Sequence, residues 1–179
     1  MARTDSRQTG AEMSAADPRE SGTEVSATNA LESADATAAA DRLARDVGDV
    51  MYRADACSRA LGFELLEVRP GYARMRATVR PDFLNGHDIC HGGLIFTLAD
   101  STFAFACNSR NVNTVASGCS IDFLRAVHGG DTLTAEATEQ TLNGRTGIYD
   151  IRVTNRASET VAVFRGKSAQ IKGNVIPPG

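Results

Sequence analysis

The residues of this chain whose types and spacing could do chemistry lie between Cys90 and Cys107. The stretch Leu94–Cys107, LIFTLADSTFAFAC, carries a single charged side chain, Asp100, near its middle. A carboxylate on an otherwise apolar helix is expensive to bury unless it is paired or used. The residues just before this stretch, CHGG at 90–93, leave backbone N–H groups free at the start of a helix. Together these features predict a helix end that polarises a carbonyl and a nearby carboxylate, which are the parts needed to hydrolyse an activated acyl group.

Gly92 is the candidate for polarising the carbonyl. The first four N–H groups of a helix have no partner within it, and the macrodipole adds about half a positive charge there. An N–H group at that end would stabilise the oxyanion that develops on a thioester carbonyl, and a glycine allows close approach because it has no Cβ. The alternative is that Gly92-Gly93 only forms a tight entry into the helix.

Asp100 is the candidate for the attack on that carbonyl. A carboxylate can act as a base on water or attack the carbonyl itself. Because a thioester has a good leaving group, no catalytic triad is obligatory. The structural alternative is a buried aspartate whose carboxylate is satisfied by nearby hydroxyls, which are those of Thr97, Ser101 and Thr102.

The spacing of the two residues adds a constraint. Gly92 and Asp100 are eight residues apart, so their Cα atoms would be about 12 Å apart on one straight helix. A carbonyl carbon under attack must lie within about 3–3.5 Å of its nucleophile, with its oxygen equally near the oxyanion donor. Two antiparallel helices in a two-fold dimer could each lend one residue to each of two equivalent sites. The hypothesis therefore requires a homodimer.

Two further residues of the preceding loop could take part. The Asn85 amide could orient the attacking water or hold the carbonyl, and His91 could hydrogen-bond the thioester. The structural alternatives are an Asn-Gly turn at Asn85 and a satisfied loop histidine at 91. His87, Cys90 and His91 also form an H-x-x-C-H cluster that zinc could use, but no second ligand pair at the usual spacing accompanies it, so no metal is expected.

Periodicity predicts the elements that must position these residues. Apolar and polar residues alternate strictly from Tyr72 to Arg80, as in a half-buried strand, and Asn143-Gly144 is a strong hairpin signal. The apolar helix should be enclosed. An antiparallel sheet wrapped around one central helix, of the α+β class, fits the order of elements. The expected elements are a helix with its apolar positions at Leu43, Val47, Val50, Met51 and Ala54, a turn at Ala56–Leu61, strands at Phe63–Val68 and Tyr72–Arg80, a loop at Pro81–Gly93, the helix Gly93–Ser109, and strands near Thr114–Leu124, Thr132–Leu142, Gly147–Asn155 and Thr160–Ile171.

Length and composition bound the rest. The chain has 179 residues and a formal net charge of −3, which gives no basic footprint for nucleic acid. No apolar run approaches the roughly 18–20 residues of a membrane span. The N-terminus lacks the apolar core of a signal peptide, so a cytoplasmic location is expected.

The ends of the domain and the cysteines can also be anticipated. Residues 1–34 are rich in Ala, Ser, Thr and Glu and contain no aromatic residue, so a disordered tail is expected there and one domain over residues 35–175. In a reducing compartment the four cysteines are most simply free thiols. Two of them, Cys107 and Cys119, are expected in apolar surroundings.

Four blocks of the sequence carry a resemblance to a known family. They are NGHDICHGGLIFTLADSTFAFACNS, SGCSIDFLRAVHGGDTLTAEA, GRTGIYDIRVTN and VAVFRGKS. From about Val50 to Gly173 the chain resembles the hotdog-fold acyl-CoA thioesterases, in particular those of phenylacetic acid degradation. The resemblance implies an antiparallel sheet around a long central helix and a dimer that pairs into a tetramer. It also implies hydrolysis, without a cofactor, of aryl-acetyl-CoA thioesters such as phenylacetyl-CoA and its ring-hydroxylated forms to the free acid and CoA.

The resemblance also assigns roles to residues. The aspartate matching Asp100 is the nucleophile or general base and comes from the facing subunit, while the N–H matching Gly92 polarises the carbonyl. Asn85 and His91 match residues that line the reacting centre. The chain departs from the pattern at two places: Ala54 stands where relatives can carry Asn, and Ala126 stands where Pro is common.

Coenzyme A carries phosphates, so cationic contacts are expected for the acyl-CoA substrate. The candidates are Arg125, Arg145 and Lys167, with Arg165 as a fourth, although a solvated surface role is the commoner one for each.

Two other functions remain open from the sequence alone. A hotdog hydratase or dehydratase would want a histidine and a carboxylate set for proton transfer, and none of His87, His91 and His128 sits in such a pattern. A non-catalytic acyl-CoA binding module would leave Asp100 without a chemical role.

Overall fold

Strands and one central helix form the domain that carries the candidate residues. The computed structural model describes residues 21–177, with side chains described from residue 32 onward. The chain divides into two units, residues 1–36 and residues 37–179. Within the described residues the elements, in chain order, are α1 (Ser21–Ala54), α2 (Ala56–Leu61), β1 (Glu64–Arg69), β2 (Tyr72–Thr78), the 3₁₀ turn η1 (Pro81–Phe83), α3 (Gly92–Asn108), β3 (Thr114–Phe123), β4 (Thr132–Asn143), β5 (Thr146–Thr154) and β6 (Thr160–Gln170).

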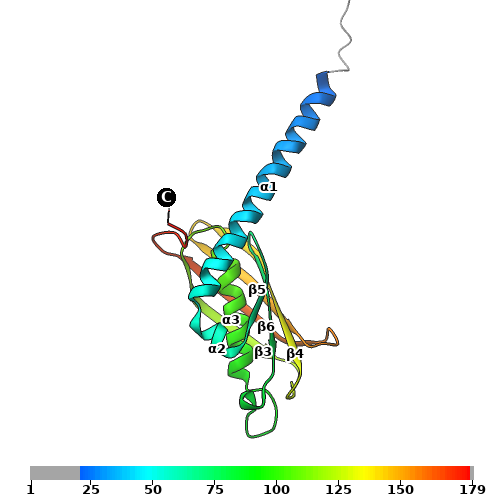
Figure 1. Cartoon of the computed structure of the whole chain (residues 1–179), viewed down its shortest axis with the longest axis vertical. Helices are drawn as coiled ribbons and strands as arrows, with labels where there is room; N and C mark the ends of the chain where they lie inside the picture. The colour runs from blue at the N-terminus through cyan, green and yellow to red at the C-terminus, as the bar shows by residue number, and fades with distance from the viewer. Residues whose placement is uncertain (1–20, 178–179) are drawn as a thin grey trace, which may run out of the picture. The chain divides into compact units, whose positions relative to one another are not determined.

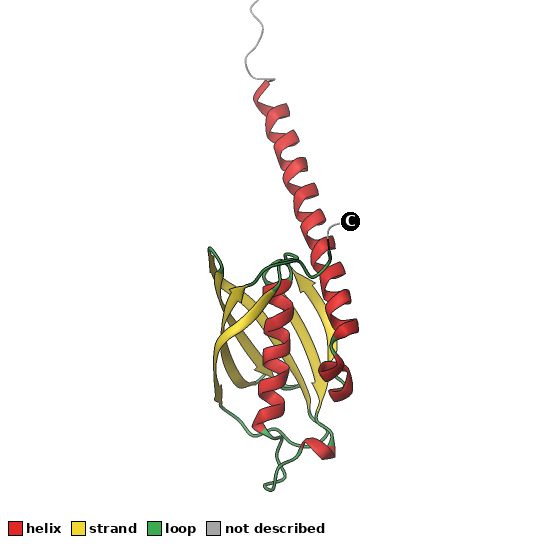
Figure 2. Ribbon diagram, turned by 90° about the vertical axis from the view of Figure 1, so that its left-hand side faces the viewer, coloured by secondary structure: helices red, strands yellow, loops and turns green. Residues whose placement is uncertain are grey.

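One antiparallel sheet wraps around α3 (Figures 1 and 2). Among the described residues it has six strands in the order β1-β2-β4-β5-β6-β3. Strands β1 and β2 form a hairpin through Gly71, whose φ is +73°, and β4 and β5 form another through Gly144, whose φ is +58°. Strand β3 pairs only with β6, from Thr114 opposite Gln170 to Phe123 opposite Ala162. Strands β1 and β3 are therefore the two edges of the sheet.

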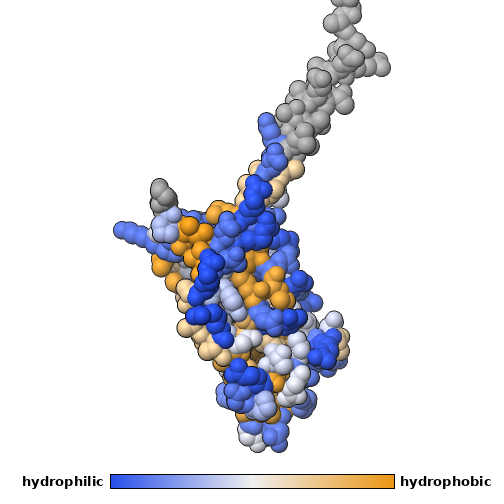
Figure 3. Space-filling view, viewed as in Figure 1, coloured by the Kyte–Doolittle hydropathy of each residue, from blue (hydrophilic) through white to orange (hydrophobic). Residues whose placement is uncertain are grey.

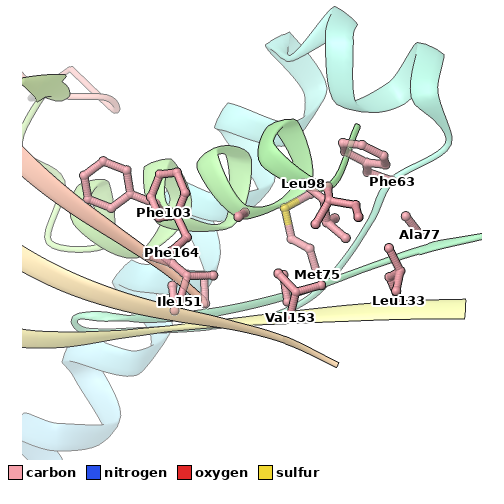
Figure 4. Packing of buried hydrophobic residues seen from close by; sticks show 14 of the residues in the cluster. Phe63, Met75, Ala77, Leu98, Phe103, Leu133, Ile151, Val153 and Phe164 are labelled. Carbon is pink, nitrogen blue, oxygen red and sulfur yellow. The ribbon is translucent and has the colours of Figure 1, made fainter. Parts of the chain in front are cut away.

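The core lies between α3 and the inner face of the sheet. Figure 4 shows the α3 side chains Leu98 and Phe103 pointing toward Met75, Ile151 and other buried residues of the strands. The Phe103 ring packs on Tyr149, with ring centroids 5.3 Å apart. Because strand residues alternate between faces, every second residue of β2, of β5 and of the first half of β4 is buried. This core fixes α3 against the sheet and thereby fixes the position of any group that α3 carries.

The elements agree with those expected from periodicity, with ends that differ by one or two residues. The helix α1 is the exception, because it begins at Ser21 instead of in the mid-thirties. Residues 32–40 of α1 are exposed, so their helix rests on local propensity, which is high for the alanines there. A disordered tail was expected over residues 1–34. Its first 20 residues lie outside the described part of the chain, and from Ser21 onward the tail is helical. The boundary of the domain at residue 35 stays a prediction.

Two expectations about burial were wrong. Leu43, placed on the apolar face of α1, is 40% exposed, and the buried residues of that face are Ala44 and Val47. The helix α3 is not enclosed all round either. Its less buried side includes Gly93, Thr97, Asp100 and Ala104, which recur at helical spacing. In a single chain one stripe of α3 is therefore open.

The surface is mostly polar on the face shown in Figure 3. Blue, hydrophilic residues predominate along the described part of α1, and smaller apolar areas lie between them. No helix among residues 21–177 is long and apolar enough to cross a membrane.

Candidate functional site

The first turn of α3 leaves one backbone donor free. His91 is the N-cap residue, and its Nδ1 accepts a hydrogen bond from the N–H of Gly93 at 2.9 Å. The N–H of Leu94 is bonded to the His91 carbonyl at 2.9 Å. Among the described residues no acceptor is bonded to the N–H of Gly92. The cap therefore occupies the neighbouring donors and leaves the Gly92 N–H at the positive end of the helix dipole.

The loop before α3 is tied down by its own hydrogen bonds. The Asn85 Oδ1 accepts from the N–H of His87 at 2.8 Å, and the N–H of Asn85 donates to the Ile89 carbonyl at 2.9 Å. The side-chain oxygen thus closes the turn, as the structural alternative predicts. Among the described residues the Asn85 side-chain NH₂ has no acceptor, so it can still donate to a ligand.

A hollow of about 370 Å³ opens beside the start of α3. Its walls are mainly apolar, and its polar groups are few, which is the usual character of a small-molecule site. The lining residues are Asn85, Ile89, Cys90, Gly92, Ile95, Phe123, Leu124, Arg125, Ala126 and Val127. The structure thus brings Asn85, Gly92 and Arg125 together around one space.

The ring of Phe123 packs closely against Gly92 at the start of α3. A Cβ placed on Gly92 would lie 3.0 Å from the Phe123 Cζ, closer than ordinary van der Waals contact. Gly92 is not among the described glycines with a positive φ, so its backbone conformation does not demand glycine. Because Gly92 has no Cβ, the Phe123 ring of β3 can lie close to the first turn of α3. Sequence reasoning missed Phe123, and the DFLR block that contains it was the available signal.

Asp100 lies two turns further along α3, on the open stripe. Burial raises the pKa of its carboxyl group, and a hydrogen bond from the Cys119 thiol opposes that rise. The thiol Sγ is 3.9 Å from the Asp100 Oδ1. The hydroxyls of Ser101 and Thr102 have other partners: Ser58 donates to the Ser101 Oγ at 3.2 Å, and Thr102 donates to the Leu98 carbonyl at 2.7 Å.

Gly92 and Asp100 do not meet within one chain. Both lie on the continuous helix α3, at a separation of about 12 Å from helix geometry. The hollow at the helix start contains Gly92 and excludes Asp100. The argument that one helix cannot bring both residues to one carbonyl therefore applies to α3 in the structure.

The candidate CoA contacts are scattered. Arg125 borders the hollow, and its Nη1 lies 3.9 Å from Glu159. Arg145 donates from Nε to the Gln170 carbonyl at 3.0 Å, at the far end of β6 from Arg125. Lys167 is exposed on β6, and Arg165 forms a salt bridge with Asp150 at 2.7 Å. Only Arg125 lies beside the start of α3.

The cysteines are free, as expected, but they differ in surroundings. Cys90 and Cys107 are buried, and burial raises the pKa of the Cys107 thiol to about 12. Cys119 is exposed, so the expectation of apolar surroundings was wrong for it. The reason is that β3 is an edge strand with little packed over it. Within residues 21–177 no group of three His, Cys, Asp or Glu side chains is arranged to hold a metal ion, and the His91 Nδ1 is used by the helix cap.

Comparisons with known proteins agree with this fold. The family described as the thioesterase superfamily matches residues 87–162, which include the end of the loop, α3 and Asp100. The acyl-coenzyme A thioesterase PaaI of Escherichia coli (strain K12) is 50% identical over 125 residues, covering 70% of this chain and 89% of PaaI. A putative esterase of Archaeoglobus fulgidus is 34% identical over 142 residues, covering 79% of this chain and 92% of the relative.

Solved structures give the same result. The E. coli PaaI protein from the phenylacetic acid degradation operon superposes with a TM-score of 0.74 at 47% identity, covering 75% of this chain and 97% of that one. A Streptococcus mutans protein bound to acetyl CoA has a TM-score of 0.61 at 26% identity, covering 63% of this chain and 90% of that one.

The sheet around α3 and the donor at its start define a hotdog-fold enzyme of the thioester hydrolase class. More narrowly, the chain belongs to the family of acyl-CoA thioesterases that includes E. coli PaaI.

Proposed function

We propose that this thioesterase hydrolyses aryl-acetyl-CoA thioesters, such as phenylacetyl-CoA and its ring-hydroxylated forms, at a site built between two copies of the chain. The observation that carries the proposal is the unpaired N–H of Gly92 at the start of α3. A donor fixed in that position can stabilise the oxyanion of a thioester under attack without reorganising.

A second copy is needed to bring a carboxylate to that donor. Edge strand β3 exposes a row of backbone groups together with Val115 and Phe123, which are 46% and 50% exposed. Such an edge is a template for pairing with another strand. The open stripe of α3 lies beside it, since Asp100 contacts Cys119 of β3. A two-fold dimer that pairs the β3 edges would cover both, and it would set Asp100 of one copy toward Gly92 of the other.

In this proposal the substrate carbonyl accepts a hydrogen bond from the Gly92 N–H, and Asp100 of the partner subunit attacks from the other side. Acting as a base, Asp100 takes a proton from water while the water oxygen bonds to the carbonyl carbon. The C–S bond then breaks, and CoA leaves as a thiolate that is protonated. Acting as a nucleophile, Asp100 forms a mixed anhydride that water opens. A single turnover in heavy-oxygen water tests the anhydride route: water that attacks the Asp100 carbonyl carbon of the anhydride leaves label in Asp100, whereas base catalysis places label only in the product acid.

The substrate class rests on the hollow and on the relatives. The apolar walls at Ile89, Ile95 and Phe123 suit an aromatic acyl group. The E. coli relative comes from the phenylacetic acid degradation operon, and the S. mutans protein was solved with acetyl CoA. We assign Arg125 to a CoA phosphate because it borders the hollow, with Arg145 and Lys167 as weaker candidates because neither lines it.

We also place the enzyme in the cytoplasm, as a tetramer made of two dimers. Four free cysteines suit a reducing compartment. The tetramer follows from the family resemblance, and sedimentation equilibrium would test it.

Two matched substitutions at Gly92 test the donor. Gly92→Pro removes the N–H at the first helical position, where proline is tolerated, and His91 before it has an extended conformation that precedes proline readily (φ −63°, ψ 129°). Gly92→Ala adds a Cβ that also disturbs Phe123 but keeps the N–H. We expect kcat for phenylacetyl-CoA to fall about 10²–10³-fold more in Gly92→Pro than in Gly92→Ala.

The companion variant is Asp100→Asn, for which we expect a loss of about 10²–10⁴-fold in kcat with KM largely kept. A thiol-release assay across aryl, short-chain and long-chain CoA esters measures all three variants. Equal activity of the two Gly92 variants, or full activity of Asp100→Asn, would refute the proposed site.

A further inference from the structure

Strand β3 presents a row of side chains along α3 that matches the spacing of the two catalytic positions. Cys119, Ile121 and Phe123 alternate onto one face of the strand, since no bulge interrupts their pairing with β6. Ile121 packs against the core, Phe123 meets Gly92 and Cys119 meets Asp100. Four strand residues span about 13 Å, and the eight helix residues from Gly92 to Asp100 span about 12 Å. Each end of this row therefore touches one catalytic position.

The contact at the Asp100 end is a hydrogen bond with a defined direction. Burial and the nearby Asp100 charge raise the pKa of the Cys119 thiol, so at neutral pH the sulfur carries its proton and donates. The Asp100 Oδ1 accepts across 3.9 Å, the long separation of a weak thiol donor. Among the described residues Cys119 is the only side chain that donates to this carboxylate.

We propose that Cys119 is a positioning residue for Asp100: its thiol holds one carboxylate oxygen and leaves the other free to face the attacking water or the carbonyl carbon. The inference rests on the proposed function of Asp100. It adds a role for a residue inside β3, an element that sequence reasoning did not connect to the site.

Three substitutions separate donation from packing. Cys119→Ala removes the thiol, Cys119→Val keeps its bulk without a donor, and Cys119→Ser keeps a donor on a shorter bond. We expect kcat to fall about three- to tenfold in the alanine and valine variants, with KM within about twofold of the wild type. The serine variant should recover part of the loss.

The acidic limb of the pH–rate profile gives a readout that packing alone would not move. Because the thiol hydrogen bond lowers the Asp100 pKa, its removal should shift this limb to higher pH in the alanine and valine variants. Titratable groups that interact with Asp100 are Cys119 on β3 and Cys107 on α3 itself, and Cys107 is unchanged in all variants. Alanine and valine variants with wild-type kcat and an unshifted limb would overturn the proposal, as would a serine variant no better than valine.

A second measurement does not depend on activity. In a Cys57→Ala, Val115→Lys background, in which the lysine is expected to keep the β3 edge unpaired, Cys119 is the one exposed cysteine of the three that remain. The rate of its reaction with a neutral disulfide reagent, followed against pH, reports the thiol titration. We expect Asp100→Asn to move the midpoint to lower pH, because it removes the charge that holds the proton on sulfur. An unmoved midpoint would mean that Asp100 and Cys119 do not interact. If the midpoint moves but the Asp100→Asn enzyme keeps full activity, the contact exists and the proposed function of Asp100 is refuted.

Discussion

Asp100 combines a structural cost with a proposed chemical use in one side chain. It is partly buried on an apolar helix, and burial raises the pKa of its carboxyl group. One weak thiol donor opposes the effect, and within the described residues no cation forms a salt bridge with it. A side chain that opposes folding in this way is retained where function needs it. The composition of the helix alone was enough to single out this residue.

The cost predicts a gain in stability when the charge is removed. The folded-state pKa of Asp100 lies above its unfolded value, so between these two values the native state holds more protons than the unfolded one. The free energy of unfolding therefore falls as the pH rises through that interval. Asp100→Asn should raise the Tm at pH 7 relative to the wild type, and the difference should shrink as the pH falls to the ordinary aspartate range.

Thermal unfolding of both proteins from pH 3.5 to pH 8 measures this difference. Asp49→Asn, on an exposed position of α1, controls for the loss of one negative charge. A lower Tm for Asp100→Asn at neutral pH would contradict the argument.

At the scale of residues, the sequence did not predict the contacts between residues that are far apart in the chain. Asp100 and Gly92 could be singled out as candidates because both lie in one helix whose pattern is plain. Cys119 and Phe123 reach them from another strand, 19 residues after Asp100 in the case of Cys119. Nothing in a single sequence says which strand lies beside which side of a helix.

At the scale of elements, the N-terminus of α3 is organised by its cap. His91 satisfies the Gly93 N–H and in doing so leaves Gly92 as the free donor. This makes the structural alternative for His91 correct and also useful, since the cap selects which N–H remains available.

The cap predicts a pair of outcomes for substitutions at position 91. His91→Ala should lower the free energy of unfolding by about 0.5–2 kcal/mol, because it leaves the Gly93 N–H without its acceptor. His91→Asn keeps an accepting side chain at the N-cap and should lose much less. Urea unfolding followed by far-UV circular dichroism measures both, and equal losses would show that the His91 side chain does not stabilise the helix as a cap.

The elements themselves were largely predictable, and the order of strands was not. Asn143-Gly144 predicts a hairpin, and β4 and β5 form one there. Strand β3 instead pairs with β6, which follows it only after two intervening strands. That long-range pairing makes β3 an edge, and the edge leaves Cys119 exposed.

At the scale of the whole molecule, the edge of β3 is the feature that has no pairing strand within the described part of a single chain. Natural sheets usually protect an edge with charge, proline or a covering element. Here the edge carries the exposed apolar residues Val115 and Phe123. Pairing with a second copy would remove this liability and complete the proposed site in one step.

A lysine placed on this edge should separate the copies. Val115→Lys changes a residue that is 46% exposed in the single chain, so the fold should survive, while a charged side chain on the edge strand opposes strand pairing. We expect the sedimentation coefficient to drop to that of a monomer and the turnover per chain to fall about tenfold or more. Leu142→Lys, at an exposed apolar residue of β4, is the matched control and should change neither. An active Val115→Lys monomer would contradict the shared site.

Mixing two inactive chains gives the sharpest consequence of a site shared across a two-fold axis. Asp100→Asn lacks the acid, and Gly92→Pro lacks the donor, so each homodimer should be nearly inactive. A mixed dimer combines the intact Gly92 of the first chain with the intact Asp100 of the second at one of its two sites. When equal amounts are refolded together, half of the dimers are mixed and about a quarter of wild-type activity should return. If both residues served the same site from one chain, no mixture could restore activity, because every site would lack one of them.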